Sequence, residues 1–178
     1  MYEEVLRFWF EEVSPDNWWS AEAAFDVEVV SRFGSLLLQA SQGELHEWRE
    51  APKGRLAEII VLDQFSRNIY RGTPKAFSQD AVALVLSQEA VRTGIQESLS
   101  PVEMSFALMP FMHSESARIH VQAERLFREH APASNYEFEL KHKAIIDRFA
   151  RYPHRNAVLG RASTEDEQEF LKEQGAQF

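Results

Sequence analysis

The chain of 178 residues contains no cysteine, and this absence excludes several classes of protein. Disulfide frameworks, thiolate nucleophiles and cysteine-ligated zinc or iron–sulfur centres all require that residue. No stretch approaches the roughly 18 consecutive apolar residues that a membrane-spanning helix needs. The first residues, MYEEVLRFWFEEV, lack the basic start and apolar run of a secretory signal. We therefore expect a cytoplasmic protein with no membrane partner.

Glycine-rich and histidine-based signature motifs are missing as well. The sequence has no GxGxxG, GxxxxGK[ST] or GxSxG motif, which argues against the common dinucleotide-binding, P-loop and α/β-hydrolase proteins. No HExxH motif or similar close pair of histidines sets a metal-binding geometry. The sequence therefore predicts neither a metal site nor a cofactor.

A net positive charge is also lacking, because 28 acidic residues outnumber 19 basic ones and leave a formal charge of −9. Non-specific binding to nucleic acid needs a positive surface, so we expect no nucleic-acid partner. The charge is uneven: residues 1–50 carry −8, whereas residues 141–161 carry +5. The basic segment suits a local anion site. Alternatively, the two ends of the chain attract each other across the fold.

What the chain does contain is a succession of helical patterns. Apolar residues recur at spacings of three and four, and no window alternates convincingly with period two. We predict an all-α fold without a sheet, as a single domain over residues 1–178. The expected helices cover residues 2–12, 20–40, 44–49, 56–72, 77–93, 100–110, 114–130, 135–152 and 163–175. Expected N-terminal caps are Ser20, Ser100 with Glu103, Ser114, Ser134 with Glu137, and Ser163 with Asp166.

The segment 56–72, LAEIIVLDQFSRNIYRG, combines the most apolar helix-length stretch with the densest polar cluster. One face is apolar throughout, whereas the opposite face is apolar only in its first half. The second half of that face carries Asp63, Gln64, Arg67, Asn68 and Arg71. A helix that is apolar on both sides at one end is expected to be buried, so the polar cluster should line an internal cleft. Alternatively, it is a hydrogen-bonded network that only ties helices together.

Three further groups interrupt the apolar pattern. His113, Ser114 and Glu115 follow Pro110 at a junction between helices. Backbone amides there suit an anion, or else the serine and glutamate only cap a helix. His142 lies within an apolar stripe, so we predict that it is shielded from solvent. The third group is the basic turn that contains His154, Arg155 and Asn156.

Several long motifs occur in order along the chain. They are the early FWF and WW segments, GELHEW, LDQFSRNIYRGTPKAF, LMPFMHSES, and FELKHKAIIDRFARYPHRNAVLGR with STEDEQEFL. Together they resemble the bacterial family of unknown function called DUF924 over essentially the whole chain. The resemblance implies a tetratricopeptide-repeat-like, right-handed array of antiparallel helices, and no activity comes with it. Ala150 occupies a position where the family pattern leads us to expect glycine as often as not.

Two functional hypotheses from different classes use the same cleft. In the first, the cleft binds an anionic small molecule or a peptide carboxylate, because the planar fork of arginine grips such groups at two points. Its expected lining is Asp63, Gln64, Arg67, Asn68, His113, Ser114, Glu115, Arg148, His154, Arg155 and Asn156. In the second, the protein is a hydrolase or transferase whose catalytic candidates are His113, Glu115, Asp63 and His142.

A third hypothesis is a scaffold whose apolar outer helix faces bind another protein or a second copy of the chain. Geometry separates the first two. The enzyme requires a histidine within hydrogen-bond reach of a carboxylate and open to a pocket, whereas binding needs only converging cationic groups. We place the binding hypothesis first.

Overall fold

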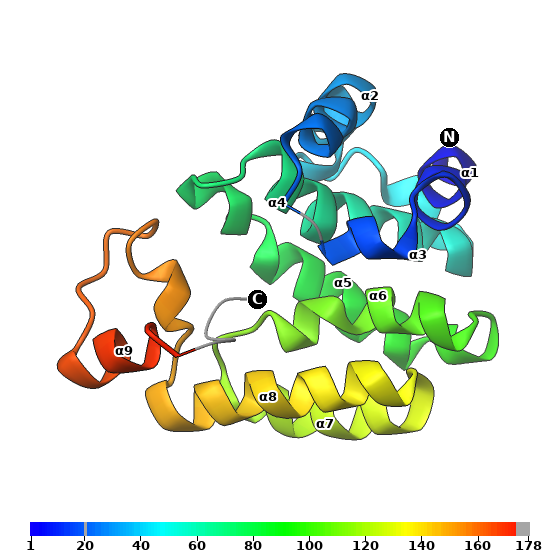
Figure 1. Ribbon diagram of the computed structural model, residues 1–178. Coiled ribbons are helices and arrows are strands. Elements are labelled where there is room, and N and C mark those ends of the chain that lie inside the picture. The colour runs from blue at the N-terminus through cyan, green and yellow to red at the C-terminus, as the bar shows by residue number, and fades with distance from the viewer. Residues whose placement is uncertain (20, 174–178) are drawn as a thin grey trace.

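The computed structural model describes residues 1–19 and 21–173, and these ranges contain helices and turns but no strand. The prediction of an all-α fold is therefore confirmed. The helices, shown in Figure 1, are α1 (Tyr2–Arg7), α2 (Ala23–Ser41), α3 (Pro52–Ile60), α4 (Ser66–Ile69), α5 (Asp80–Arg92), α6 (Pro101–Met112), α7 (Ala117–His130), α8 (Ala133–Phe149) and α9 (Glu165–Phe170). None of the helices in these ranges is long and apolar enough to cross a bilayer.

Short helical turns join these elements. Two are π-helical and continue an α-helix, namely η1 (Phe8–Glu12) after α1 and η4 (Val61–Phe65) after α3. The others are 3₁₀ turns: η2 (Pro15–Trp19), η3 (His46–Glu50), η5 (Pro74–Phe77), η6 (Ile95–Glu97) and η7 (Pro153–Arg155). The predicted central helix is thus the continuous run α3–η4–α4. It begins four residues earlier and ends three residues sooner than expected.

The run α3–η4 lies at the centre of the molecule. All ten residues from Leu56 to Phe65 are buried, and this run packs against α1, α2, α5 and α6. Phe65 stacks on Phe33 of α2 with ring centroids 4.7 Å apart, and Phe33 lies 4.9 Å from Phe8. The expected burial of this helix is confirmed. Its polar residues therefore occupy positions that only internal partners or a cavity can satisfy.

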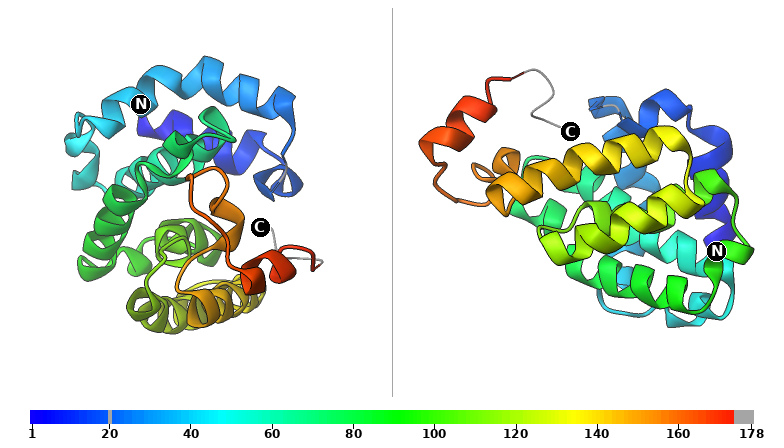
Figure 2. Two further views of the ribbon diagram at one scale, coloured as in Figure 1. Left: turned by 90° about the vertical axis from the view of Figure 1, so that its left-hand side faces the viewer. Right: turned by 90° about the horizontal axis from the view of Figure 1, so that it is seen from below.

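Helices α6, α7 and α8 pack in sequence, each antiparallel to the one before (Figures 1 and 2). The expected capping box at the start of α6 is confirmed, because Ser100 and Glu103 cap one another's backbone. We expected the helix to stop or kink at Pro110, and it does not stop there. The helix continues to Met112, and the bond from the His113 amide to the Met109 carbonyl, at 2.9 Å, closes the turn beyond the proline.

Other expected caps differ from the structure by one or two residues. Helix α7 begins at Ala117, not at Ser114, because the Ser114 carbonyl instead accepts a hydrogen bond from His120 at 2.8 Å. Helix α8 begins at Ala133, so Ser134 lies inside its first turn and does not cap it. Thr164, not Ser163, caps α9, with Glu167 as its reciprocal partner. The cap expected at Ser20 and the helix end expected at residue 175 lie outside the described residues.

Helix α8 ends at Phe149, three residues earlier than expected, and the φ of its C-terminal cap Ala150, 56°, lies in the left-handed region. In that region a residue with a side chain costs about 1–2 kcal/mol relative to glycine. Part of this gain is lost on substitution, because glycine gives the unfolded chain more conformational freedom. We expect Ala150→Gly to raise the free energy of unfolding by about 0.5–1 kcal/mol, measured by urea denaturation.

Ala131 ends α7 with a φ of −110° and is the matched control for this substitution. Ala131→Gly gains no relief of strain, so it should lower the stability. A loss of stability in Ala150→Gly as large as that in Ala131→Gly would contradict the assignment of strain to Ala150.

Candidate functional site

A cavity of about 560 Å³ lies between the N-terminal helices and the turn that follows α8. Segments far apart in the sequence form its wall. They contribute Trp18, Trp19, Ala21, Gln64, Arg67, Asn68, Arg71, Gly72, Ala76, Phe77, Met109, Met112, His113, Asn135, Phe138, His142, Tyr152, His154 and Arg155. The polar half of the central helix thus borders a cavity, together with the basic turn near the C-terminus.

Three arginines line this cavity, and each is held by a carboxylate that does not line it. Arg67 donates two hydrogen bonds of 3.1 Å to Asp80. Arg71 donates to both oxygens of Asp26, at 2.5 and 2.8 Å. In the part of the chain that the structure describes, no aspartate or glutamate belongs to the cavity wall. A bound molecule would therefore contact the cationic arginines, whereas the aspartates that pair with them do not border the cavity.

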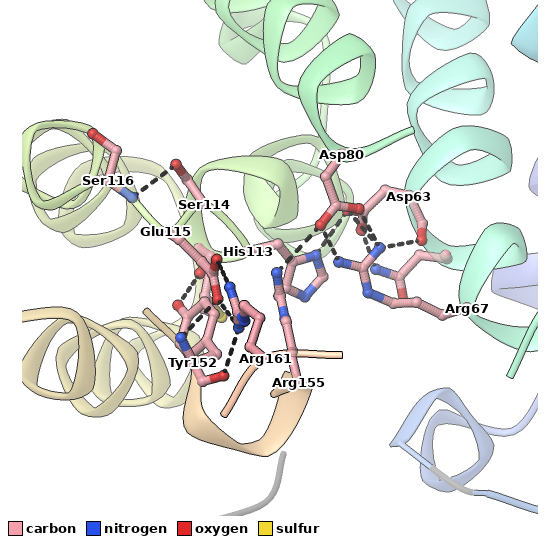
Figure 3. Close-up of polar contacts among 12 residues, drawn as sticks. Asp63, Arg67, Asp80, His113, Ser114, Glu115, Ser116, Tyr152, Arg155 and Arg161 are labelled. Carbon is pink, nitrogen blue, oxygen red and sulfur yellow. Dashed lines mark hydrogen bonds and ion pairs between the residues drawn. The ribbon is translucent and has the colours of Figure 1, made fainter. Parts of the chain in front are cut away.

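Asp63 connects this cluster to a histidine. Its side chain is 1% exposed, and its Oδ1 lies 2.7 Å from Nδ1 of His113 and 3.3 Å from Nη1 of Arg67 (Figure 3). Gln64 donates to its other oxygen at 2.5 Å. Burial alone would raise the pKa of Asp63, but the charge of Arg67 and the contact with His113 hold it below its ordinary value. The carboxylate is therefore ionised at neutral pH.

His113 ends α6 and lines the cavity, with 15% of its side chain exposed. Burial and the neighbouring charge of Arg67 lower its pKa, so the imidazole is neutral at pH 7. Because Asp63 is the ionised partner, Nδ1 carries the proton and donates it to the carboxylate. The other ring nitrogen, Nε2, then has a free lone pair and no hydrogen-bond partner within residues 1–19 and 21–173.

Arg155 comes from η7 and is 6% exposed. Its guanidinium lies between the rings of Phe77 and Tyr152, at 4.7 and 4.5 Å, and donates to Asp80 at 3.4 Å. Its Nε is buried and makes no hydrogen bond with any residue that the structure describes, and the same is true of Nδ1 of His154. Burial and the charge of Arg67 lower the pKa of Arg155. Asp80, shared with Arg67, thus compensates the charge of this arginine only in part.

A second hydrogen-bonded network supports the wall from behind. Tyr152 donates its hydroxyl hydrogen to the Met112 carbonyl, and the hydroxyl oxygen lies 3.2 Å from Nε2 of His120. The Nδ1 atom of His120 lies 2.7 Å from Glu139, and both residues are fully buried. Burial raises the pKa of Tyr152 and of Glu139. This network fixes the turn that carries Arg155.

The prediction that His142 is shielded from solvent is confirmed, because it is 7% exposed. Its Nδ1 lies 2.8 Å from the Phe138 carbonyl, and burial lowers its pKa to about 3. Burial and Arg155 lower the pKa of His154 to about 4. Both rings are therefore neutral parts of the cavity wall.

The sequence hypotheses grouped several residues that the structure separates. Gln64, Arg67, Asn68, His113, His154 and Arg155 line the cavity, whereas Asp63 lies behind the wall. Glu115 accepts two hydrogen bonds from Arg161 and one from the Tyr152 amide, which ties the C-terminal turn to the start of α7. Ser114 contacts His120, and Asn156 bonds to Arg161 and Ser163. Neither borders the cavity.

Arg148 lies on the outer surface, where it pairs with Asp166 at 3.6 Å and covers the ring of Phe149. Sequence reasoning also missed two residues that organise the site, Asp80 and Tyr152. Asp80 had the appearance of an ordinary acidic first-turn residue of a helix. The described residues hold no cluster of three or more metal-ligating side chains.

Comparisons with known proteins agree with this architecture but carry no activity. A search of curated proteins found no match. A solved structure, that of the protein of unknown function ATU0120 from Agrobacterium tumefaciens, is 32% identical, with a TM-score of 0.91, and the match covers 96% of each chain. The family model for bacterial proteins of unknown function named DUF924 matches residues 5–175. The chain therefore belongs to the DUF924 family.

Proposed function

We propose that the cavity binds a small molecule with one negative charge and an apolar body, such as a carboxylate joined to an aromatic or branched aliphatic group. The main support for this proposal is the distribution of charge at the cavity wall. Arg67, Arg71 and Arg155 border the cavity, whereas Asp26, Asp63 and Asp80 lie behind it. Guanidinium groups presented in this way bind carboxylates by charge-assisted hydrogen bonds.

The number of charges favours a carboxylate over a phosphate. Three buried or half-buried aspartates offset the three arginines, and burial keeps the neighbouring histidines neutral. The site therefore has no excess of positive charge for a doubly charged phosphate. Within the described residues, Arg155 has the weakest counterion contact of the three arginines, because it reaches Asp80, shared with Arg67, at 3.4 Å and its Nε has no partner. A singly charged carboxylate on Arg155 brings less uncompensated negative charge into the site than a phosphate would.

The rest of the wall suits an apolar body. Trp18, Phe77, Phe138 and Met109 line the cavity, and the Trp18 ring is held by a 2.9 Å bond from its indole nitrogen to the Trp9 carbonyl. A volume of about 560 Å³ lies within the range of roughly 300–1,000 Å³ typical of small-molecule sites. A peptide whose last residue is large and apolar offers the same chemistry through its C-terminal carboxylate.

Calorimetry and thermal shifts with matched ligands test this proposal. We expect phenylacetate and 4-methylvalerate to raise the melting temperature, and their neutral amides to have no effect. At 100 times the dissociation constant, a ligand adds about 2.7 kcal/mol of stability. N-acetyl-glycyl-phenylalanine and its amide distinguish a peptide carboxylate from a free acid. Equal shifts with acid and amide would contradict the proposal.

Substitution of the cavity arginine gives a sharper test. We expect Arg155→Met to weaken phenylacetate binding at least about tenfold, because a charge-assisted hydrogen bond contributes about 1.5–3 kcal/mol. The matched control is Arg148→Met, which removes an arginine of the same C-terminal segment that lies outside the cavity. Unchanged affinity in Arg155→Met, or equal losses in both variants, would remove Arg155 from the site.

Two other expectations have weaker support. The scaffold hypothesis relies on the outer face of α2, which exposes Val27, Val30 and Leu38. The right-handed, tetratricopeptide-repeat-like arrangement implied by the family resemblance is likewise a proposal, supported by the antiparallel succession of α6, α7 and α8 (Figure 1). The hydrolase or transferase hypothesis relies on a different observation, the pairing of His113 with Asp63.

A further inference from the structure

The described residues of the cavity wall include a base but no side-chain nucleophile. Its wall includes His113, whose Nε2 has no protein partner, and no serine, threonine, cysteine, lysine, aspartate or glutamate of the described residues belongs to it. The hydroxyl hydrogen of Tyr152 is committed to the Met112 carbonyl. Among the described residues of the wall, none therefore offers a free hydroxyl, thiol, amine or carboxylate for a covalent intermediate. A base in such a site acts on water or on the ligand itself.

The surroundings of His113 are those of a general base. Asp63 holds Nδ1 at 2.7 Å and is itself held by Arg67 and Gln64, so the ring has one tautomer and one orientation. Arg155, which belongs to η7, contacts the same Asp63–Arg67–Asp80 cluster through a hydrogen bond to Asp80 (Figure 3). A basic nitrogen and a partly compensated guanidinium thus border one cavity.

We propose that the protein hydrolyses carboxylic esters with an apolar acyl group, with His113 as the general base that activates water and Arg155 as the group that stabilises the oxyanion. This inference rests on the proposed function, because the carboxylate bound by the cavity is then the product. The same guanidinium serves both steps. It donates to the oxyanion of the tetrahedral intermediate and afterwards to the carboxylate that forms from it.

The reaction balances with water as the second substrate. The water oxygen bonds to the ester carbonyl carbon while one of its protons passes to Nε2 of His113. The carbonyl electron pair moves onto the oxygen, which Arg155 stabilises. When the intermediate collapses, the bond from carbon to the alcohol oxygen breaks and that oxygen takes the proton from His113. The acid product loses its remaining proton to solvent, and Asp63 stays ionised throughout.

Hydrolysis of ethyl phenylacetate, followed by chromatography of the phenylacetate released, tests the inference. We expect turnover by the wild-type protein and a loss of about 10²–10⁴-fold in kcat for His113→Gln, the range that a general base contributes. The exposed His46 supplies the control His46→Gln, which should turn over at the wild-type rate. The rate should rise with pH and level off below the ordinary histidine pKa of 6.5, because the pKa of His113 is lowered.

A second variant separates catalysis from folding. Asp63→Asn keeps the shape of the side chain but stabilises the wrong tautomer of His113, so it should lower kcat while circular dichroism stays native. Phenylacetate binding is measured for each variant. Retained binding with lost turnover supports the inference. Binding of phenylacetate without wild-type turnover, or full turnover by His113→Gln, overturns it and leaves the binding function standing, whereas absence of both binding and turnover overturns both.

Discussion

Replacing Arg67 by methionine should lower the free energy of unfolding by about 3–5 kcal/mol, because the change leaves buried carboxylate charge without its partner. Arg67 donates two hydrogen bonds to Asp80 and one, at 2.7 Å, to the backbone carbonyl of Asp63. It also holds the pKa of Asp63 below its ordinary value. The substitution thus removes the cation that keeps a fully buried carboxylate ionised. Carboxylate binding should be lost with it.

Urea denaturation of Arg67→Met beside Arg92→Met measures this effect. Arg92 forms an exposed pair with Glu89, so its replacement should change the stability little. The double variant Arg67→Met with Asp80→Asn should recover part of the loss, since it removes one of the stranded charges. A loss in Arg67→Met no larger than that in Arg92→Met would show that the cluster does not stabilise the fold.

The same variant should change how stability depends on pH. The folded-state pKa of Asp63 is depressed, so this carboxylate contributes stability above its unfolded pKa of about 3.9 and loses it progressively as the pH falls. Without Arg67 the depression is smaller, and the loss of stability from pH 5 downward should be shallower than in the wild type. Parallel pH profiles for the two proteins would contradict the coupling of Arg67 to Asp63.

Gly54→Ala should destabilise the protein by about 3 kcal/mol or more, because there is no space for the added methyl group. A Cβ at position 54 would lie 2.1 Å from the carbonyl oxygen of Trp48 and 2.9 Å from its carbonyl carbon. These are backbone atoms, so no rotamer change relieves the overlap, and η3 has to move away from α3. Arg49 and Glu58, which join these two elements by bonds of 2.7 and 2.6 Å, would be pulled apart.

Gly34→Ala is the matched control, because it makes the same change inside α2 where nothing lies within 4 Å. There the alanine should raise the stability by about 0.5–1 kcal/mol through its higher helix propensity. Thermal and urea denaturation of the two variants should therefore give effects of opposite sign. Changes of the same sign would mean that helix propensity or the unfolded chain, and not packing against Trp48, governs position 54.

Prediction from sequence succeeded where the structure depends on neighbours along the chain. The period of apolar residues locates the helices, and Ser100 with Glu103 forms the expected capping box. It was wrong where a distant partner decides the local conformation. Ser114 does not begin a helix because its carbonyl accepts a hydrogen bond from the His120 side chain, and the first helical amides bond to the Ser116 carbonyl instead. Helix α6 passes Pro110 inside the buried core, where tertiary packing outweighs the proline.

The candidate site divides in the same way. Asp63, Gln64, Arg67 and Asn68 were identifiable because polar residues on a buried helix stand out against a local pattern. Asp80 and Tyr152 were not, because their importance comes from partners 13 and 40 residues away along the chain. Arg148 and Arg155 look alike in the sequence. Only packing places one on the surface and the other between Phe77 and Tyr152.

By itself the sequence determined that this protein is all-α, that the helix within residues 56–72 is buried at its apolar end and that a polar cluster follows that end, because periodicity and burial follow from the local order of residues. The tertiary structure alone decided which arginines share a cavity, that their carboxylates lie behind its wall, and that His113 meets Asp63 across 50 residues. Those arrangements depend on contacts between distant segments, whose geometry no local pattern specifies.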